Sequence, residues 1–449
     1  MLEQGGRLPA AVKELSKQRS AWMGTPAGMI RSSRHYEAAF QLQISSSVST
    51  AFKDGIGMGD NGRKPLPVGK WAVCEAPARI DLAGGWSDTP PIAYEYGGKV
   101  TNLAILIDGV RPIGSAVRII ETPMLRLRLV PRKGDPGGET VEVFKLEDMM
   151  DYNKPQGAGS LLKAALVCTG LVSVAPGAPE LEVQLRSLLG GGLEIQSWSD
   201  LPQGSGMGTS SILAGAVLAA LSTATGQGPQ GDDELVHGVL QLEQTLTTGG
   251  GWQDQVGGLV PGAKLASSAA TLPLKVAIDR IQTPVGFLEE LGRHMVLVYT
   301  GRTRLAKDIL QNVLRRWNAR LPEAVETMDL LTENAEVCRT ALCDGSVARV
   351  GACLDAYWRH KKVMAVGCEP PECKAMIQAL RSQDIIHGVS LCGAGGGGFM
   401  ALVTKEADAI EDVRRVFLDI PGFAKEVVTL HRVTVDPDGH VITEVTGAL

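Results

Sequence analysis

The sequence has no surplus of basic residues, no apolar run long enough to span a membrane and no closely paired cysteines. Lys and Arg number 44 against 49 Asp and Glu, and the net charge of −5 gives no electrostatic footprint for nucleic acid or an anionic membrane. The longest apolar run, at 212–221, is about half a bilayer span, and the N-terminus has no apolar signal segment. We therefore expect a soluble, cytoplasmic protein whose partners are small molecules. The sequence does not indicate whether the chain self-associates.

The eight cysteines are scattered and form no C-x-x-C pair, which favours reduced thiols. The chain is rich in glycine: 54 of its 449 residues, about 12%, are glycine, against a usual ~7%. This excess predicts many tight turns. A chain of this length has room for two domains with large cores.

Strand and helix patterns alternate from about residue 70 to the end, which predicts an α/β (α+β) fold in two halves. Residues 1–65 are expected to be a leader, a linker or the remnant of an N-terminal half. Residues 66–286 and 287–449 are expected to form the two domains. Helices are expected at 209–225 and 232–248, among others, and a strand–turn–strand unit around 386–404.

The stretch "LPQGSGMGTSSILAGAVLAAL" from position 201 reads as a glycine turn entering a helix, yet it has no lysine. A helix N-terminus has unpaired N–H groups and a partial positive charge, so its backbone can hold a phosphate without a lysine. Thr209, Ser210 and Ser211 stand at the expected helix start. The alternative is that these hydroxyls only cap the helix.

Glu243 interrupts an apolar helix face. Val236, Val239 and Leu240 mark that face, and the next position on it, where an apolar residue is expected, is Glu243. A buried ionised carboxylate is costly unless it is paired or binds a metal. Beside a phosphate site this favours Mg²⁺, which commonly takes one or two protein oxygens. The alternative places Glu243 at the edge of the face, paired with an arginine.

Three further segments have residues suited to phosphoryl transfer. In "TTGGGWQDQVGG", Asp254 is set among glycines that allow a ligand to approach closely, and it could orient or deprotonate a hydroxyl; the alternative is a turn residue or helix cap. "APARIDLAGGWSDTPP" provides a cation, Arg79, and an acid, Asp88, for charge stabilisation and hydroxyl binding. "CGAGGGG" at 392–398 is either a plain hairpin or a close backbone approach to a ligand.

Taken in order, these motifs resemble those of the GHMP kinases over about residues 70–449. The resemblance implies two α/β domains with the active site in the cleft between them, ATP as co-substrate and Mg²⁺ as cofactor, and makes 66–286 the ATP-binding domain. It implies that Ser210 and Glu243 hold the metal, that Asp254 is the base or orienting acid, that Arg79 is the catalytic cation, and that Asp88 binds sugar hydroxyls. The implied ATP-binding residues are Pro202, Gly204, Ser205, Gly206, Met207, Gly208, Thr209, Ser210 and Ser211.

The chain departs from the galactokinases, because Gly85 and Trp86 stand where those enzymes have Glu-His, and galactose is therefore disfavoured. It is closer to the branch that phosphorylates fucose and heptose phosphates, above all to the kinase half of fucokinases. The resemblance thus implies conversion of L-fucose to L-fucose 1-phosphate, in fucose salvage towards GDP-fucose. The expected substrate-binding residues are Asp88, Trp86, Gly85, Trp252, Gly395, Gly396 and Gly397.

Several alternatives stay open. The two tryptophans could instead be core residues. A heptose-phosphate kinase would need a cationic pocket for the substrate phosphate, for which Arg302 and Arg304 are candidates, although they could equally lie on the surface at a helix start. A protein of another class, a catalytically inactive sugar sensor, would need no base, so the presence of Asp254 together with Arg79 argues against it.

Overall fold

The computed structural model describes residues 60–449 except 203, 247–249, 272–273, 303–305, 422 and 424–425, together with eight isolated positions before residue 60 (14, 17, 18, 20, 21, 24, 28 and 35). The expected leader at 1–65 therefore lies almost entirely outside the described residues. No helix in the described part of the chain is long and apolar enough to cross a membrane.

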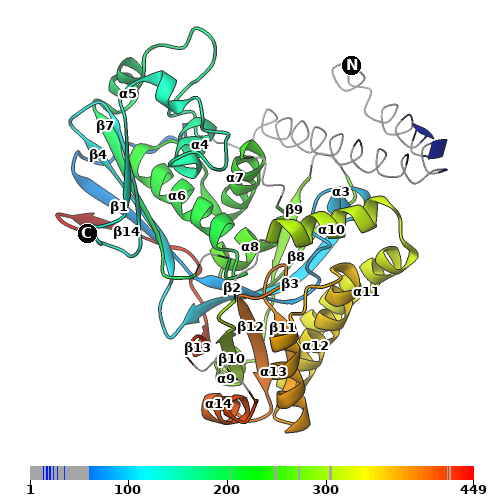
Figure 1. Ribbon diagram of the computed structural model, residues 1–449. Helices are drawn as coiled ribbons and strands as arrows, with labels where there is room; N and C mark the ends of the chain where they lie inside the picture. The colour runs from blue at the N-terminus through cyan, green and yellow to red at the C-terminus, as the bar shows by residue number, and fades with distance from the viewer. Residues whose placement is uncertain are drawn as a thin grey trace.

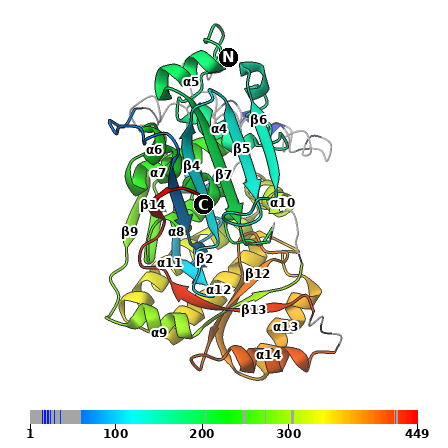
Figure 2. The same ribbon diagram turned by 90° about the vertical axis from the view of Figure 1, so that its left-hand side faces the viewer.

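Two β-sheets organise the molecule (Figures 1 and 2). The six-stranded sheet has the order β14 (Val441–Thr446), β1 (Lys70–Ala76), β4 (Ile113–Ile120), β7 (Gly192–Ser199), β5 (Leu125–Val130) and β6 (Glu139–Val143). The eight-stranded sheet has the order β11 (Ile386–Leu391), β12 (Phe399–Thr404), β10 (Met295–Tyr299), β13 (Thr429–Val435), β3 (Gly98–Ile107), β8 (Ala263–Ser268) and β9 (Val276–Arg280), and β2 (Ala78–Ala83) also pairs with β3.

Each sheet takes strands from both halves of the chain. The last strand, β14, pairs antiparallel with β1, and β13 pairs with β3. The strands before and after residue 286, the domain boundary expected from the sequence, therefore do not form two separate sheets. The two sheets are linked into one structure through the β1–β2 segment and the C-terminal strands.

Helices cover one face of the six-stranded sheet, where α6 (Thr209–Thr225) lies against β1 and β4 beside α4 (Ser160–Cys168) and α7 (Gly231–Thr245) (Figure 1). The alanine-rich α6 is buried on nearly every side, as expected for a helix that is apolar all round. Its bounds are those predicted from the sequence. The other helices described before residue 287 are α5 (Leu181–Leu189), α8 (Gln253–Leu259), the short 3₁₀ turn Leu146–Met149 and α3 (Ile92–Tyr96), which lies beside α10 (Ala306–Asn318).

The second core lies between the eight-stranded sheet and the C-terminal helices, where α11 packs on α12 and α12 packs on β11. Its helices are α9 (Phe287–Arg293), α10 (Ala306–Asn318), α11 (Pro322–Cys343), α12 (Val347–Met364), α13 (Pro371–Ser382) and α14 (Ile410–Leu418). The helices α11 and α12 also contact β2, so this core reaches the strand that holds Arg79.

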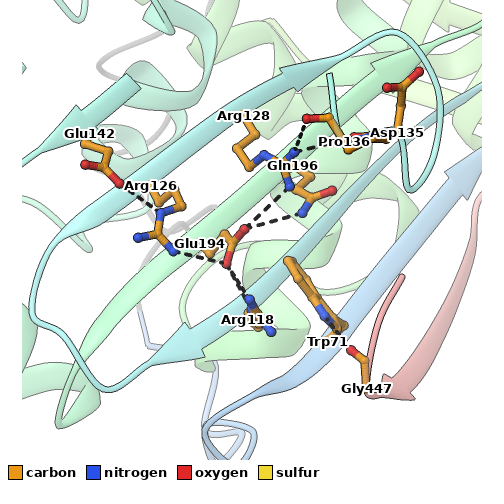
Figure 3. A network of polar contacts seen from close by, with 10 residues as sticks. All are labelled: Trp71, Arg118, Arg126, Arg128, Asp135, Pro136, Glu142, Glu194, Gln196 and Gly447. Carbon is orange, nitrogen blue, oxygen red and sulfur yellow. Dashed lines mark hydrogen bonds and ion pairs between the residues drawn. The ribbon is translucent and has the colours of Figure 1, made fainter. Parts of the chain in front are cut away.

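The face of the six-stranded sheet that points away from α6 has a charged cluster centred on Glu194 (Figure 3). Arg126 of β5 and Arg118 of β4 lie opposite Glu194 in the ladder, and Arg118 Nη2 is 2.7 Å from its Oε2. Arg126 and Arg128 each place a nitrogen 3.9 Å from the carboxylate. The alternating "LRLRLV" pattern of β5 explains this arrangement, because Leu125 and Leu127 enter the core while Arg126 and Arg128 lie on the opposite face; Leu129, near the end of the strand, is exposed.

We predict that Glu194→Ala lowers the free energy of unfolding by about 2 kcal/mol, because three guanidinium groups then lose the carboxylate between them. The Glu194 side chain is 4% exposed. Glu142→Ala is the matched control, since Glu142 and its partner Arg126 are 43% and 38% exposed, and its loss should cost at most about 0.5 kcal/mol. Urea unfolding of both variants measures this, and equal losses would contradict the prediction.

Candidate functional site

The glycine turn between β7 and α6 has the backbone that an anion-binding loop requires. Gly204, Gly206 and Gly208 have φ angles of 72°, 75° and 75°, in the left-handed region that favours glycine. Gly208 is the N-cap of α6, so no side chain caps the helix from that position. The alternative in which a serine or threonine serves as N-cap is therefore wrong, and the first-turn residues Thr209, Ser210 and Ser211 line the cavity described next.

A cavity of about 360 Å³ opens at this helix start. It is lined by Arg79, Trp86, Thr89, Gly204, Ser205, Gly206, Gly208, Thr209, Ser210, Ser211, Glu243, Gly250, Gly251, Gln253, Asp254, Leu310, Tyr357, Gly393 and Ala394. The structure thus brings together the glycine loop, the Glu243 helix, the Asp254 segment and the Arg79 strand. Two residues expected at the ATP site lie elsewhere: Met207 is buried in the core, and Pro202 lines a separate cavity of about 270 Å³.

Arg79 and Asp254 are in direct contact. Arg79 Nε donates to Asp254 Oδ1 at 2.8 Å, and Arg79 Nη2 also bonds that oxygen. Arg79 Nη1 donates to Gly206 O at 3.0 Å and lies 3.2 Å from Asp81 Oδ2. Burial alone would lower the pKa of Arg79, but Asp254 and Asp81 outweigh that effect and raise it, so the guanidinium stays charged.

Asp81 holds the far side of Arg79. It stands two residues after Arg79 on β2, is 5% exposed, and has no hydrogen bond to either carboxylate oxygen among the described residues. Burial raises the pKa of Asp81, while Arg79 lowers it. The pairing of one buried cation with two carboxylates explains how Arg79 is tolerated inside the protein.

The helix α8 presents Asp254 to the cavity and is held from both ends. At its C-terminal end the buried Lys264 donates from Nζ to Gly257 O at 2.6 Å, Val260 O at 2.7 Å and Gly262 O at 3.2 Å. At its N-terminal end Gln253 N donates to Asp88 Oδ2 at 3.0 Å. The Asp254 side chain remains 27% exposed, which leaves it accessible to a ligand.

Glu243 lies in the cavity wall, 5% exposed, and its Oε1 accepts a hydrogen bond from Ser211 Oγ. It is not at an exposed edge, so the rim position of the alternative is wrong, while the pairing with an arginine stays an alternative. The neighbouring Ser210, which the motif assigned to the metal, is exposed in the cavity lining. Burial raises the pKa of Glu243 to about 8, and the charges of Asp254 and Asp88 add a smaller increase. The hydrogen bond from Ser211 acts in the opposite direction and lowers this pKa.

These residues fit a Mg²⁺ ion held partly by phosphate. A buried carboxylate whose burial and acidic neighbours disfavour its charge is stabilised by a nearby cation. Among the described residues no group of three or more His, Cys, Asp and Glu is placed to hold a metal by itself. Mg²⁺ does not require such a cage, because it commonly takes one or two protein oxygens and completes its shell with water and phosphate oxygens.

The predicted sugar-binding residues are only partly at the cavity. Trp86 lines it, but Asp88 and Trp252 lie behind the wall, at 1% and 0% exposure, and Trp252 belongs to a core cluster. Gly85 is buried below the side chains of Tyr357 and Gln253. Burial raises the pKa of Asp88 to about 7. A direct contact of Asp88 with the sugar stays a prediction.

The glycine segment 392–398 connects β11 to β12 as a hairpin and also packs against the glycine loop that precedes α6. Phe399 N donates to Ser205 O at 2.9 Å, and a Cβ on Gly206 would lie 2.7 Å from Cys392 O. Gly393 and Ala394 line the cavity. The predicted substrate residues Gly395, Gly396 and Gly397 lie instead against Cys368 and Arg302, and Gly396 N donates to Cys368 O at 2.7 Å.

Sequence reasoning missed several cavity residues. Tyr357 comes from α12, far from every motif, and no local pattern marked it. Leu310 of α10 was not singled out either. Thr89, Gly250, Gly251 and Gln253 lie within the quoted segments and could have been found by considering every residue of those segments. Asp81 had a signal of its own, an acid two residues from a buried arginine on a strand.

We predict that Glu243→Gln stabilises the metal-free protein at alkaline pH. The folded pKa of about 8 exceeds the ordinary value of 4.5, so wild-type stability from this group is complete below the unfolded pKa and is lost as the pH rises through about 8. The variant resembles the protonated form. Its unfolding midpoint should match wild type at pH 5 and exceed it by a few degrees at pH 9, with Glu142→Gln as control; no gain at pH 9 would refute the assignment.

Comparison with known proteins places the chain in one family. Residues 179–262 match the model of the GHMP kinases N terminal domain, and residues 338–419 match that of the GHMP kinases C terminal domain. The chain is 35% identical over 344 residues to a bifunctional fucokinase/GDP-fucose pyrophosphorylase of Arabidopsis thaliana, covering 76% of this chain and 30% of that protein. It is 33% identical over 391 residues to an L-fucokinase/L-fucose-1-P guanylyltransferase of Bacteroides fragilis, covering 85% and 39%.

The chain thus spans well under half the length of these two relatives. Its fold matches the crystal structure of Lactococcus lactis galactokinase complexed with galactose, with a TM-score of 0.59 and 16% identity over 83% of this chain and 95% of that one. This likeness confirms the mixed α/β fold predicted from the sequence. With both family models and the motif order in agreement, the chain belongs to the GHMP kinase family.

Proposed function

We propose that the chain is an ATP- and Mg²⁺-dependent sugar kinase that converts L-fucose to L-fucose 1-phosphate. The observation that supports it most is the contact of Arg79 with Asp254 at the start of α6, inside one cavity with the glycine loop. The printed names of the two relatives at 33% and 35% identity support fucose as the sugar. Their second activity is not part of this proposal.

The glycine loop is proposed to bind the phosphates of ATP through backbone N–H groups of residues 204–211 and the positive end of α6. Ser210 and Glu243 are the residues that would hold Mg²⁺. When bound, the ion neutralises charge on the β- and γ-phosphates. Arg79, held by Gly206 O and Asp254, adds a fixed cation on the other side of the loop.

Asp254 is proposed to act on the sugar hydroxyl. The contacts that Arg79 makes with Asp254, described above, reach its Oδ1, and Oδ2 is the oxygen proposed to face the substrate. The anomeric oxygen attacks the γ-phosphorus, the bond to the β–γ bridging oxygen breaks, and ADP leaves. The hydroxyl proton passes to Asp254, or is oriented by it until it is lost to solvent.

The alternatives have less support. A heptose-phosphate kinase needs a cationic pocket, but Arg302 is exposed, pairs with Glu372 at 2.6 Å and is not part of the cavity lining, while Arg304 lies outside the described residues. A catalytically inactive sensor would have no need to keep a buried cation against a cavity-facing carboxylate.

The proposal is tested by assaying ADP release with L-fucose, D-galactose and a D-manno-heptose 7-phosphate. We expect turnover with L-fucose at a kcat/KM at least about tenfold above the others, and transfer to the anomeric oxygen identified by ³¹P NMR. Absence of L-fucose turnover would refute the assignment of fucose as the substrate. Turnover of the heptose phosphate alone would favour a heptose-phosphate kinase.

In the same assay Asp254→Asn should lower kcat by about 10²–10⁴-fold, the usual range for loss of an acid–base group. The control is Asp279→Asn, since Asp279 pairs with Arg339 on the surface and its side chain is 55% exposed. ATP binding should survive in both variants. Unchanged phosphate transfer by Asp254→Asn would disprove the role given to Asp254 in this mechanism.

We predict that Ser210→Ala raises the KM for Mg-ATP about tenfold or more and leaves sugar affinity unchanged, because only the metal–nucleotide side loses an oxygen. Ser160→Ala is the matched control. Ser160 begins α4 after the left-handed Gly159 and lies outside the cavity lining. A larger effect on the sugar than on Mg-ATP would show that the loop has been assigned to the wrong substrate.

A further inference from the structure

Gly85 provides space for two side chains that reach over it. A Cβ at this position would overlap the Tyr357 hydroxyl oxygen and would lie 2.7 Å from Gln253 Oε1. The two polar groups therefore converge above the same backbone atom, one from α12 and one from the start of α8. Both residues line the cavity that contains Arg79 and Asp254.

Two polar atoms of the side chains near Gly85 have no hydrogen-bond partner within the part of the chain that the structure describes. Gln253 Oε1 and Trp86 Nε1 are buried and have no hydrogen-bond partner among the described residues. Trp86 is 6% exposed and also lines the cavity. A buried unpaired donor or acceptor costs about 1–3 kcal/mol, so such atoms are usually satisfied by water or a ligand.

The Tyr357 hydroxyl complements this pair as a donor. Burial raises the pKa of Tyr357 well above its ordinary value, so the hydroxyl keeps its proton. Its ring is fixed by Lys361, whose Nζ lies 4.7 Å from the ring centroid and donates to Leu391 O at 2.7 Å. A rigid ring presents the hydroxyl in one direction, as specificity requires.

We propose that Tyr357, Gln253 and Trp86 form a subsite above Gly85 that binds hydroxyl groups of a neutral sugar, and that Tyr357 is a specificity-determining residue of this enzyme. The inference rests on the proposed function in taking a sugar as substrate. A sugar hydroxyl both donates and accepts, which matches an acceptor on Gln253 and donors on Trp86 and Tyr357.

The charges favour a neutral ligand over a phosphorylated one at this subsite. None of its three side chains is cationic. The nearby Arg79 is already engaged by Asp254, Asp81 and Gly206 O, and Lys361 is buried with its Nζ bonded to Leu391 O. A phosphate group placed here would thus lose its hydration without a free cation in exchange.

The test is Tyr357→Phe, which keeps the ring and removes only the hydroxyl. We expect the KM for the sugar to rise about 5- to 50-fold while the KM for ATP changes less than about twofold, since one buried hydrogen bond to the sugar is lost. Tyr94→Phe is the matched control, a tyrosine of 9% exposure outside the cavity lining. A purely structural role would lower thermal stability and leave the ratio of the two KM values unchanged.

Two further measurements sharpen the result. Gly85→Ala should impair sugar binding more in the wild-type background than in Tyr357→Phe, because the overlapping oxygen is then absent. A set of monodeoxy sugars should contain one analogue that wild type binds weakly and that Tyr357→Phe binds as well as the parent sugar. If Tyr357→Phe does not fold, Gln253→Leu takes its place with the same expected rise in sugar KM.

The outcomes separate this inference from the proposed function. If wild type phosphorylates L-fucose and the sugar KM of Tyr357→Phe is unchanged, the subsite is wrong and the function stands. If wild type acts on another neutral sugar, the fucose assignment fails, and the same variants test the subsite with that sugar. A wild-type chain that neither binds nor phosphorylates any neutral sugar overturns both.

Discussion

The arrangement of the site depends on one buried cation, Arg79. Its side chain is 1% exposed, and the cost of burying its charge is offset by Asp254 and Asp81, which lie against it. The same guanidinium also bonds the carbonyl of Gly206. This one side chain thereby holds β2, α8 and the glycine loop in fixed positions relative to each other. The position of the proposed base, Asp254, follows because a buried guanidinium requires a carboxylate beside it.

Close approach between these elements is possible because glycine stands at each point of contact. A Cβ on Gly257 would lie 2.8 Å from the Cβ of Arg79, and one on Gly208 would lie 3.0 Å from that of Asp254. Gly258 makes room in the same way for Ile212 of α6. The glycine excess of the composition is thus used where strand, loop and helix meet around the cavity, which is why the glycine clusters of the sequence marked the site.

The sequence predicted those parts of the site that are local in the chain. The bounds of α6, the lysine-free loop and the burial of Glu243 all follow from short patterns. Which of Ser210 and Ser211 contacts Glu243 does not follow from such a pattern. Successive residues of a helix point about 100° apart, and it is the packing of α7 on α6 that brings Ser211 to Glu243. Tyr357 was equally out of reach, since α12 is brought to the cavity by the pairing of sheets that mix both halves of the chain.

Electrostatics gives a reason for the missing lysine. The walls and surroundings of the cavity contain the carboxylates of Glu243, Asp254, Asp81 and Asp88, and among the described lining residues the cation is Arg79, whose charge two of these carboxylates already balance. Burial and mutual repulsion raise the pKa values of Glu243 and Asp88 to about 8 and about 7. A single added lysine would be drawn to these acids instead of to a triphosphate. A divalent ion shared by Glu243 and the phosphates, as proposed here, would neutralise both at once, while the N–H groups of the loop carry only partial charges, whose burial costs less than that of a full charge.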